Sequence, residues 1–259
     1  MLTGGVLDCV ECTLRMAADM HTLDYESSYN EDASLYGEHI KSLNRFQSST
    51  VPLHRLLPFE YRIIELLQQA SNVQSLVDLG CGTGRFLRAA EHIGLNAAGF
   101  EVASILVNEL RRHGRHVEKG GIDEFIASDS QADAVTLLEV VEHLSNPGAA
   151  IASILNRKSP RMLVVVVPDW AKRRRFDSHF AAHDVPPNHL TWWNRESLAK
   201  LLDHHGYEVR VEEVAEIRRS LLGHIFRNRS APSPASIVDW ARALAVPPAF
   251  WLLGIAYQR

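Results

Sequence analysis

The sequence is poor in cysteine and lacks both long hydrophobic runs and an excess of basic charge. Its three cysteines are too few for a disulfide scaffold. The longest apolar runs, Met162–Pro168 and Pro247–Tyr257, fall short of the roughly 20 residues that a membrane span needs. The N-terminal residues do not show the charged and then apolar regions of a signal peptide. The formal net charge of -4 argues against a protein that coats nucleic acid. The sequence therefore predicts a cytoplasmic protein with no membrane span and no nucleic-acid partner.

Short apolar strands alternate with helices through the middle of the sequence. Strands are expected at Ser75–Leu79, Asn96–Glu101, from Val117, and at Ala132–Leu138, Met162–Val167 and Tyr207–Val214. Helices are expected at Phe59–Ala70, Arg85–Ile93, Ser104–His113, Gly148–Asn156, Ser197–His205 and Ser236–Ala245. This alternation indicates βαβ units. The continuous run MLVVVV is typical of a parallel sheet covered by helices on both faces. The pattern predicts an α/β fold and leaves Phe250–Tyr257 open as a strand or a helix.

A glycine-rich loop follows the first of these strands. In Asp78-Leu79-Gly80-Cys81-Gly82-Thr83-Gly84, glycines allow sharp turns and a close approach of the backbone to a ligand. A dinucleotide site would require G-x-G-x-x-G, but the spacing here is G-x-G-x-G and Arg85 occupies the position of the last glycine. Glu101 ends the next strand, where a carboxylate can accept hydrogen bonds from both hydroxyls of a ribose. The alternative is a structural glycine turn with a solvated Glu101.

Two segments carry a resemblance to a known family. The Asp78–Gly84 pattern resembles the first motif of class I S-adenosylmethionine-dependent methyltransferases. The segment DAVTLLEVVEHLSNP resembles the corresponding stretch of ubiquinone-biosynthesis O-methyltransferases, and the likeness extends roughly from Leu57 to Val214. It implies a Rossmann-like, mostly parallel seven-stranded sheet and S-adenosyl-L-methionine as the cofactor. The cofactor-binding residues that it implies are Asp78, Gly80, Cys81, Gly82, Gly84, Glu101, Val102, Ile122, Leu138 and Glu139. The assignment of Ile122, beside Asp123, competes with a plain turn at that position.

A Glu-Glu-His cluster follows the strand Ala132–Leu138. Ligands of open α/β sheets bind at the carboxyl ends of strands, so Glu139 through His143 should border the methyl-transfer site. His143 has the right type of side chain for a general base and is the first catalytic candidate. The alternative is that its imidazole bonds to a backbone carbonyl and shapes the loop. His189, downstream, is the second catalytic candidate.

The same residues permit a metal-dependent alternative. Small-RNA 2′-O-methyltransferases, which resemble the chain here, carry E-x-x-E-H and a later histidine that together hold a divalent ion. The corresponding residues are Glu139, Glu142, His143 and His189, a mixture of carboxylates and imidazoles that suits Mg²⁺, Mn²⁺ or Zn²⁺. The expectation is nevertheless that no metal binds, because two carboxylates beside a cationic sulfonium already have an electrostatic partner.

The segment around His189 is expected to select the acceptor. His183–Trp193 resembles a P-P-x-H-L-T-x-W stretch that covers the acceptor pocket in a branch of bacterial methyltransferases. Trp192 and Trp193 offer apolar walls, although one of them is expected to anchor the following helix instead. The basic run Lys172–Arg175 would suit an acceptor that bears a phosphate. The resulting prediction is a small hydroxylated or sugar-containing acceptor, and the oligomeric state is left open.

The domain boundaries follow from these assignments. Residues 1–58 are expected to form an N-terminal extension and residues 59–259 the methyltransferase domain, with an acceptor-covering insertion near 169–195 and a C-terminal segment at 215–259. Cys9 and Cys12 have the spacing of half a zinc site, but Thr13 stands where a zinc ribbon would have glycine, so a ribbon remnant without zinc is expected.

Two other functions stay open: an RNA 2′-O-methyltransferase, and a noncatalytic cofactor-binding protein whose pocket is blocked by Ala231–Arg259.

Overall fold

The computed structural model describes residues 5–21, 24, 33–47, 56–170, 172, 184–204, 206–215 and 249–259. The helix expected at Ser236–Ala245 and most of the basic run, Arg173–Arg175, lie outside these ranges. Among the described residues, no helix has the length and apolar character needed to cross a membrane.

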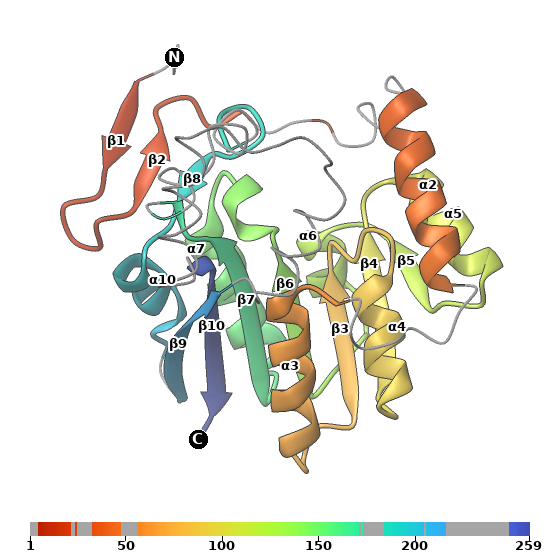
Figure 1. Cartoon of the computed structure of the whole chain (residues 1–259). Helices are drawn as coiled ribbons and strands as arrows, with labels where there is room; N and C mark the ends of the chain where they lie inside the picture. The colour runs from red at the N-terminus through yellow and green to blue at the C-terminus, as the bar shows by residue number, and fades with distance from the viewer. Residues whose placement is uncertain are drawn as a thin grey trace, which may run out of the picture.

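A seven-stranded sheet forms the centre of the molecule (Figure 1). Its strands, in spatial order, are β5 (Val117–Lys119), β4 (Asn96–Glu101), β3 (Ser75–Leu79), β6 (Ala134–Leu138), β7 (Met162–Pro168), β10 (Ala249–Gln258) and β9 (Tyr207–Ala215). The pairs from β5 to β7 are parallel, whereas β10 runs antiparallel between β7 and β9. The predicted mostly parallel seven-stranded sheet is confirmed. The segment that was open between strand and helix is a strand, because β7 and β9 both offer it a hydrogen-bonding edge.

Helices cover both faces of this sheet. The seven residues of β7 are all buried, and they alternate between two core clusters. Val164 and Val166 belong to the cluster on the side of α3 (Pro58–Gln69), α4 (Arg85–His92) and α5 (Ser104–Arg112). Val165 and Val167 belong to the cluster with side chains of α6 (Ile122–Ala127), α7 (Pro147–Ser153) and α10 (Arg195–Leu202). Burial on both sides explains why β7 is apolar throughout and not alternating.

The helix expected at Gly148–Asn156 is present, with a change of pitch. It consists of α7 followed by the π-helical turn η3 (Ile154–Lys158). The side chain of Asn146 caps α7 by accepting from the backbone N–H of Ala149 at 3.1 Å. The other predicted helices and strands that fall within the described ranges lie within a few residues of their expected bounds, whereas α6 was not predicted.

The N-terminal residues form elements that the sequence pattern did not indicate. A hairpin of β1 (Val6–Asp8) and β2 (Arg15–Ala17) joins β8 (Thr191–Trp192) in a second, antiparallel sheet, and α2 (Ala33–Gln47) follows. Cys9 and Cys12 lie in the hairpin turn as free cysteines. Thr13 there has a positive φ of 58°, the conformation that glycine adopts most easily. The hairpin is thereby attached to the segment that was expected to cover the acceptor.

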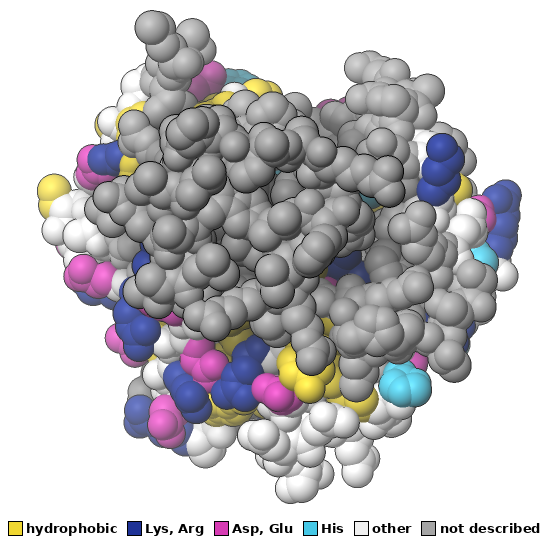
Figure 2. All heavy atoms as spheres, in the orientation of Figure 1, with side chains coloured by type: hydrophobic (Ala, Val, Ile, Leu, Met, Phe, Trp, Pro, Cys, Tyr) yellow, Lys and Arg dark blue, Asp and Glu magenta, His cyan; other side chains and the backbone are white. Residues whose placement is uncertain are grey.

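Charged side chains of both signs are mixed on the part of the surface coloured in Figure 2. Over α3 and β9, Arg62 donates to both carboxylate oxygens of Glu212, at 2.9 and 3.1 Å, and Arg210 also lies 2.9 Å from Glu212. This pairing ties the edge strand β9 to the helix beside it.

The packing of α10 on β10 depends on a glycine. A Cβ atom at Gly254 would lie 2.5 Å from Cδ1 of Leu202 and 3.0 Å from Cγ of Leu198. We expect Gly254→Ala to lower the free energy of unfolding by about 1–3 kcal/mol, because the helix must shift outward. Gly148→Ala is the control, since its Cβ would meet only an atom of Asn146 at 3.9 Å. Urea denaturation of both variants tests this, and equal stability of Gly254→Ala and the wild type would contradict it.

Candidate active site

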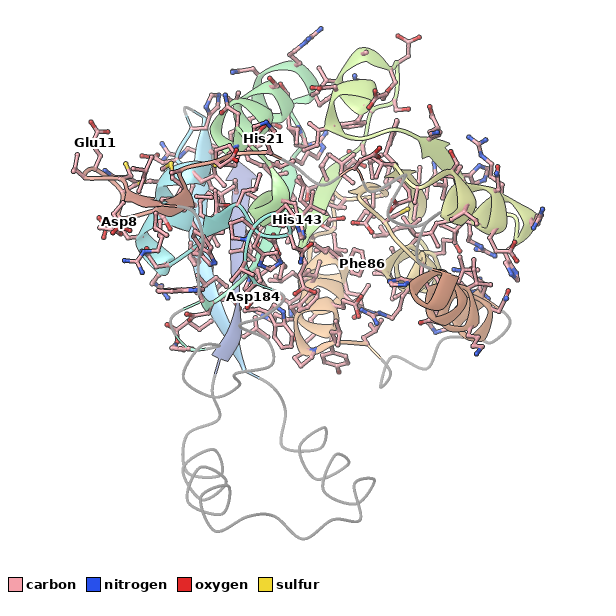
Figure 3. The ribbon with its side chains drawn as sticks, turned by 90° about the horizontal axis from the view of Figure 1, so that it is seen from above. Asp8, Glu11, His21, Phe86, His143 and Asp184 are labelled. Atoms are coloured by element: carbon pink, nitrogen blue, oxygen red, sulfur yellow. The ribbon has the colours of Figure 1, made fainter. Side chains whose placement is uncertain are left out.

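The predicted site residues meet at one edge of the sheet. β3 leads into the glycine loop, β4 ends at Glu101, and β6 leads to Glu139 and His143. These strands are parallel, so their carboxyl ends share one edge, where ligands of open α/β sheets bind. Figure 3 views the molecule from the top of Figure 1: His143 and Asp184 lie toward the middle, while Asp8 and Glu11 of the N-terminal hairpin project at the periphery.

The three glycines of the loop have different surroundings. All have positive φ values: 74° at Gly80, 53° at Gly82 and 69° at Gly84. A Cβ at Gly80 would lie 2.7 Å from Val140 Cγ2, and one at Gly84 would lie 2.6 Å from Leu110 Cδ2. At Gly82, by contrast, no atom of the described residues beyond its chain neighbours lies within 4 Å of the added Cβ. Gly80 and Gly84 are therefore required by packing, whereas Gly82 faces open space into which a ligand can approach the backbone.

Glu101 closes this loop from the neighbouring strand. Its side chain is buried, with 6% exposed, and its Oε2 accepts from the backbone N–H of Gly82 at 2.8 Å. Oε1 accepts from the backbone N–H of Ala103 at 3.0 Å. Burial raises the pKa of Glu101, and these backbone donors partly oppose the shift. A carboxylate has about four acceptor positions, so the two hydroxyl contacts predicted from the sequence are compatible with both backbone bonds.

The other predicted cofactor residues surround this point. The Cys81 thiol is buried over Gly99, where an added Cβ would lie 2.7 Å from the sulfur, and burial raises its pKa well above the usual range. Val102 is 39% exposed beside Glu101, and Ile122 begins α6. Leu138 is half-buried at the end of β6.

Asp78 is buried at the end of β3, with 2% exposed. It accepts a hydrogen bond of 2.6 Å from the Thr136 hydroxyl of β6, which lies opposite it in the parallel register. Burial raises the pKa of Asp78 to about 7, and the nearby carboxylates of Glu60 and Glu101 act in the same direction. Glu60, also buried, pairs with Arg85 at 2.8 Å.

Glu139 is held by a residue that the sequence analysis did not identify. The indole Nε1 of Trp251 on β10 donates to Glu139 Oε1 at 3.1 Å, and the Trp251 ring packs edge-on against Phe59 with centroids 5.1 Å apart. Glu139 has a positive φ of 57° while its N–H donates to the carbonyl of Val166. Because β10 is antiparallel, its first residues reach the edge at which the parallel strands end. A contact between positions 112 residues apart leaves no local signal in the sequence.

His143 is oriented by the segment that contains His189. Its Nδ1 lies 2.6 Å from the backbone carbonyl oxygen of Asn188, which is the kind of bond that the alternative to a catalytic role expected. The carbonyl oxygen of Glu142 accepts from the N–H of Leu190 at 2.8 Å. Each of the two segments therefore accepts a hydrogen bond from the other. Burial lowers the pKa of His143 and favours the neutral imidazole.

The structure brings together three of the four residues of the metal alternative. Glu142, His143 and His189 each offer a ligand atom, and these atoms lie within 4.8 Å of one another. The two imidazole rings meet edge to face with centroids 4.7 Å apart. Nδ1 of His189 lies 3.4 Å from Oδ1 of the buried Asp184. Within the described part of the chain, Glu139 is not a member of this group.

Two predictions about the acceptor segment are refined. Trp192 and Trp193 are both buried; Trp192 donates to the Asp184 carbonyl at 2.6 Å, and Trp193 packs in the same core cluster as Leu198 of α10. Their rings therefore hold the segment in place. Lys172 was considered for a phosphate, but its Nζ lies 2.6 Å from Glu213.

Comparisons with known proteins identify the class to which this fold and site belong. A model of the methyltransferase domain family matches residues 53–212, more than half of the chain. A solved S-adenosylmethionine-dependent methyltransferase from Archaeoglobus fulgidus shares the fold, with 17% identity and a TM-score of 0.56 over 88% of this chain and 100% of that one. The chain belongs to this methyltransferase family, whose class uses S-adenosylmethionine as the methyl donor.

Two further matches bear on the acceptor. A ubiquinone biosynthesis O-methyltransferase from Shewanella halifaxensis is 25% identical over 118 residues, which cover 42% of this chain. The chain spans about half of that relative, 49% of its length. The methyltransferase domain of a bacterial Hen1 has 18% identity and a TM-score of 0.53, over 77% of this chain and 97% of that one.

The open space at Gly82 generates a test of cofactor placement. We expect Gly82→Val to weaken binding of S-adenosylmethionine more than about 100-fold, or roughly 2.8 kcal/mol, because its side chain enters the space next to Glu101. Gly94→Val is a matched control, since Gly94 also has a positive φ, 92°, and no atom within 4 Å of its added Cβ, but it follows α4 away from this edge. Calorimetry should show lost affinity in the first variant alone. Unchanged affinity in Gly82→Val would contradict this placement.

Proposed function

We propose that the protein transfers the methyl group of S-adenosylmethionine to a hydroxyl oxygen of a small acceptor, with His143 as the proton acceptor. The observation that carries this proposal is the position of His143 just past the carboxyl end of β6, at the same edge as the glycine loop, with its Nδ1 2.6 Å from the Asn188 carbonyl oxygen. It supplies an oriented base at the edge where the cofactor loop lies.

The residues around Gly82 fit the cofactor. The loop backbone is open there, and Glu101 stands beside it with acceptor positions for ribose hydroxyls. The proposed contacts are made by Asp78, Gly80, Cys81, Gly82, Gly84, Glu101, Val102, Ile122, Leu138 and Glu139. When bound, the cofactor supplies a methyl group on a positively charged sulfonium. The chain contributes a close backbone approach and a set of carboxylates that favours this positive charge.

The hydrogen bond of His143 determines its chemical role. A carbonyl oxygen only accepts, so the contact with Asn188 favours the tautomer that has its proton on Nδ1 and its lone pair on Nε2. Burial lowers the pKa of His143 and favours the neutral form, while hydrogen bonds to the backbone of Asn188 and Glu139 partly oppose this shift. Nε2 can therefore take the proton of an acceptor hydroxyl as the oxygen attacks the methyl group. His189, edge to face with His143, restricts the approach of the acceptor.

The acceptor class is supported by the surrounding segment and by the relatives. Asp184 and residues 188–192 are bonded to each other and to Glu142, which gives the acceptor side of His143 a fixed wall. The Shewanella relative is named for an O-methylation in ubiquinone biosynthesis. We therefore place a small hydroxylated or sugar-containing molecule here.

Replacement of His143 tests the proposed base. We expect His143→Ala to lower kcat by about 10²–10⁴-fold while the affinity for S-adenosylmethionine stays unchanged, because Glu101 and Gly82 are untouched. In the wild type, kcat at saturating donor and acceptor should fall with decreasing pH at a midpoint below about 6.5, since protonation of the imidazole removes the base. His204→Ala is the control; its imidazole bonds to Asn156 at 2.9 Å on the surface. Full turnover in His143→Ala would exclude this role.

A second candidate is metal-assisted transfer to a ribose hydroxyl of RNA, and it is favoured by one specific arrangement. Glu142, His143 and His189 converge, and each histidine has Nδ1 directed at an oxygen, of Asn188 or of Asp184. Such oxygen partners orient the other imidazole nitrogen toward a metal. A divalent ion held there would polarise the acceptor hydroxyl as a Lewis acid. The fold is also that of the bacterial Hen1 methyltransferase domain.

Chelation separates the two candidates. We expect methyl transfer to survive dialysis against a chelator, and His189→Ala to retain most activity, because a neutral His143 accepts a proton without a cation and Glu139 is engaged by Trp251. Under the second candidate, chelation and His189→Ala would both abolish transfer, and added Mn²⁺, Mg²⁺ or Zn²⁺ would restore the chelated wild type. The acceptors to assay in parallel are a catechol and a short RNA.

A further inference from the structure

Three buried carboxylates surround the start of the cofactor loop. Asp78 at the end of β3, Glu101 at the end of β4 and Glu60 in the first turn of α3 are 2%, 6% and 3% exposed. Like charges that are buried together cannot all stay ionised without compensating partners. The partners of each carboxylate therefore determine which of them carries a proton.

The negative charges of Glu60 and Glu101 are stabilised by several hydrogen-bond donors or cations. Glu60 Oε1 lies 2.8 Å from the guanidinium of Arg85, and its Oε2 accepts from the N–H of Leu57 at 2.7 Å. Glu101 accepts from two backbone N–H groups, and the imidazole of His39 on α2 adds a favourable electrostatic interaction.

The negative charge of ionised Asp78 is stabilised by fewer partners than that of Glu60 or Glu101. Within the described part of the chain, its side-chain donor is one neutral hydroxyl, that of Thr136 on β6. The groups that face it from other elements are the carboxylates of Glu60 and Glu101, which oppose its ionisation, and the buried Cys81 thiol. Its pKa of about 7 follows mainly from burial, and the Thr136 bond offsets this only in part. At neutral pH the protonated and ionised forms of Asp78 are both populated.

We propose that Asp78 exchanges a proton for the positive charge of the cofactor, and that this exchange distinguishes the methyl donor from the demethylated product. In the cofactor-free protein, part of the population carries a proton on Asp78. On binding of the sulfonium, the carboxyl group releases that proton to solvent and becomes the counter-charge. After methyl transfer the sulfur is a neutral thioether, and Asp78 takes up a proton from solvent again. The inference rests on donor binding beside Gly82 and not on the roles proposed for His143 or the acceptor.

The sign of the pH dependence follows from this exchange. Below pH 7 the donor must displace a proton, so its affinity should rise as the pH increases through 7 and then level off. The product is neutral at sulfur and favours protonated Asp78, so its affinity should fall over the same interval. The donor-to-product affinity ratio should therefore increase with pH.

Calorimetry with the intact protein tests the exchange without any acceptor present. S-adenosylmethionine and S-adenosylhomocysteine are titrated at several pH values in phosphate and in Tris, whose different ionisation enthalpies reveal the protons exchanged. We expect the wild type to release a fraction of a proton per donor bound near pH 7 and to take up a fraction of a proton per product bound. In Asp78→Asn this difference should disappear, and donor affinity at pH 8 should fall about tenfold, the equivalent of one pKa unit.

Thr136→Val provides a variant that keeps the carboxyl group. It removes the hydroxyl that stabilises ionised Asp78, so the midpoint of proton release should move to higher pH while donor binding persists. Asp133→Asn is the matched control, because Asp133 bonds to Ser75 and Arg161 at the opposite edge of the sheet and should leave the exchange unchanged.

Three outcomes would overturn the inference: equal proton release in the wild type and Asp78→Asn, an unshifted midpoint in Thr136→Val, or a donor-to-product ratio independent of pH. Because the ammonium group of a given ligand is the same whichever variant binds it, a difference between variants with that ligand reports the protein. A protein that exchanges the proton as expected but methylates no hydroxyl would contradict the proposed function alone.

Discussion

The parallel pairing of β3 with β4 on one side and β6 on the other is the constraint on which the site depends. It places Asp78 opposite both Gly99 and Thr136, and it ends β4 where the Glu101 carboxylate meets the N–H of Gly82. A register shift of one residue would turn these side chains to the opposite face of the sheet. Burial of β3 between two strands and two helix layers therefore holds the loop and its carboxylates in place.

The second constraint is a set of bonds between segments far apart in the chain. The N–H of Ala17 in the N-terminal hairpin donates to the carbonyl of Leu190, and the N–H of Leu190 donates to the carbonyl of Glu142. The hairpin, the segment with His189 and the loop with His143 thus form one hydrogen-bonded series. This explains why a polar N-terminal stretch contributes to the same face as the candidate catalytic residues, although it contains none of them.

Electrostatics links the cofactor loop to the chemistry. Several carboxylates lie near the sheet edge with few described cations, among which Arg85 is bonded to Glu60. An arrangement of this kind is less stable when the site holds nothing positive, and a sulfonium relieves it. The environment of His143 has the opposite effect, since burial disfavours its charged form. Attraction of a cation together with a neutral His143 is what the proposed transfer of a methyl group from sulfur to oxygen requires.

The sequence by itself determined the fold class, most element bounds and the glycine loop, because these depend on periodicity and backbone conformation within short windows. Gly80, Gly82 and Gly84 adopt positive φ values that glycine tolerates without strain, and a Val-rich run such as β7 is typical of a strand buried on both faces. Only the tertiary structure decided that Phe250–Tyr257 is a strand and that Trp251 holds Glu139. It also decided that Glu142, His143 and His189 converge without Glu139, and that Asp78 lies among other buried carboxylates. Each of these facts is a contact between distant segments, and the energies involved, burial and charge–charge interaction, depend on positions in space that local sequence patterns do not specify.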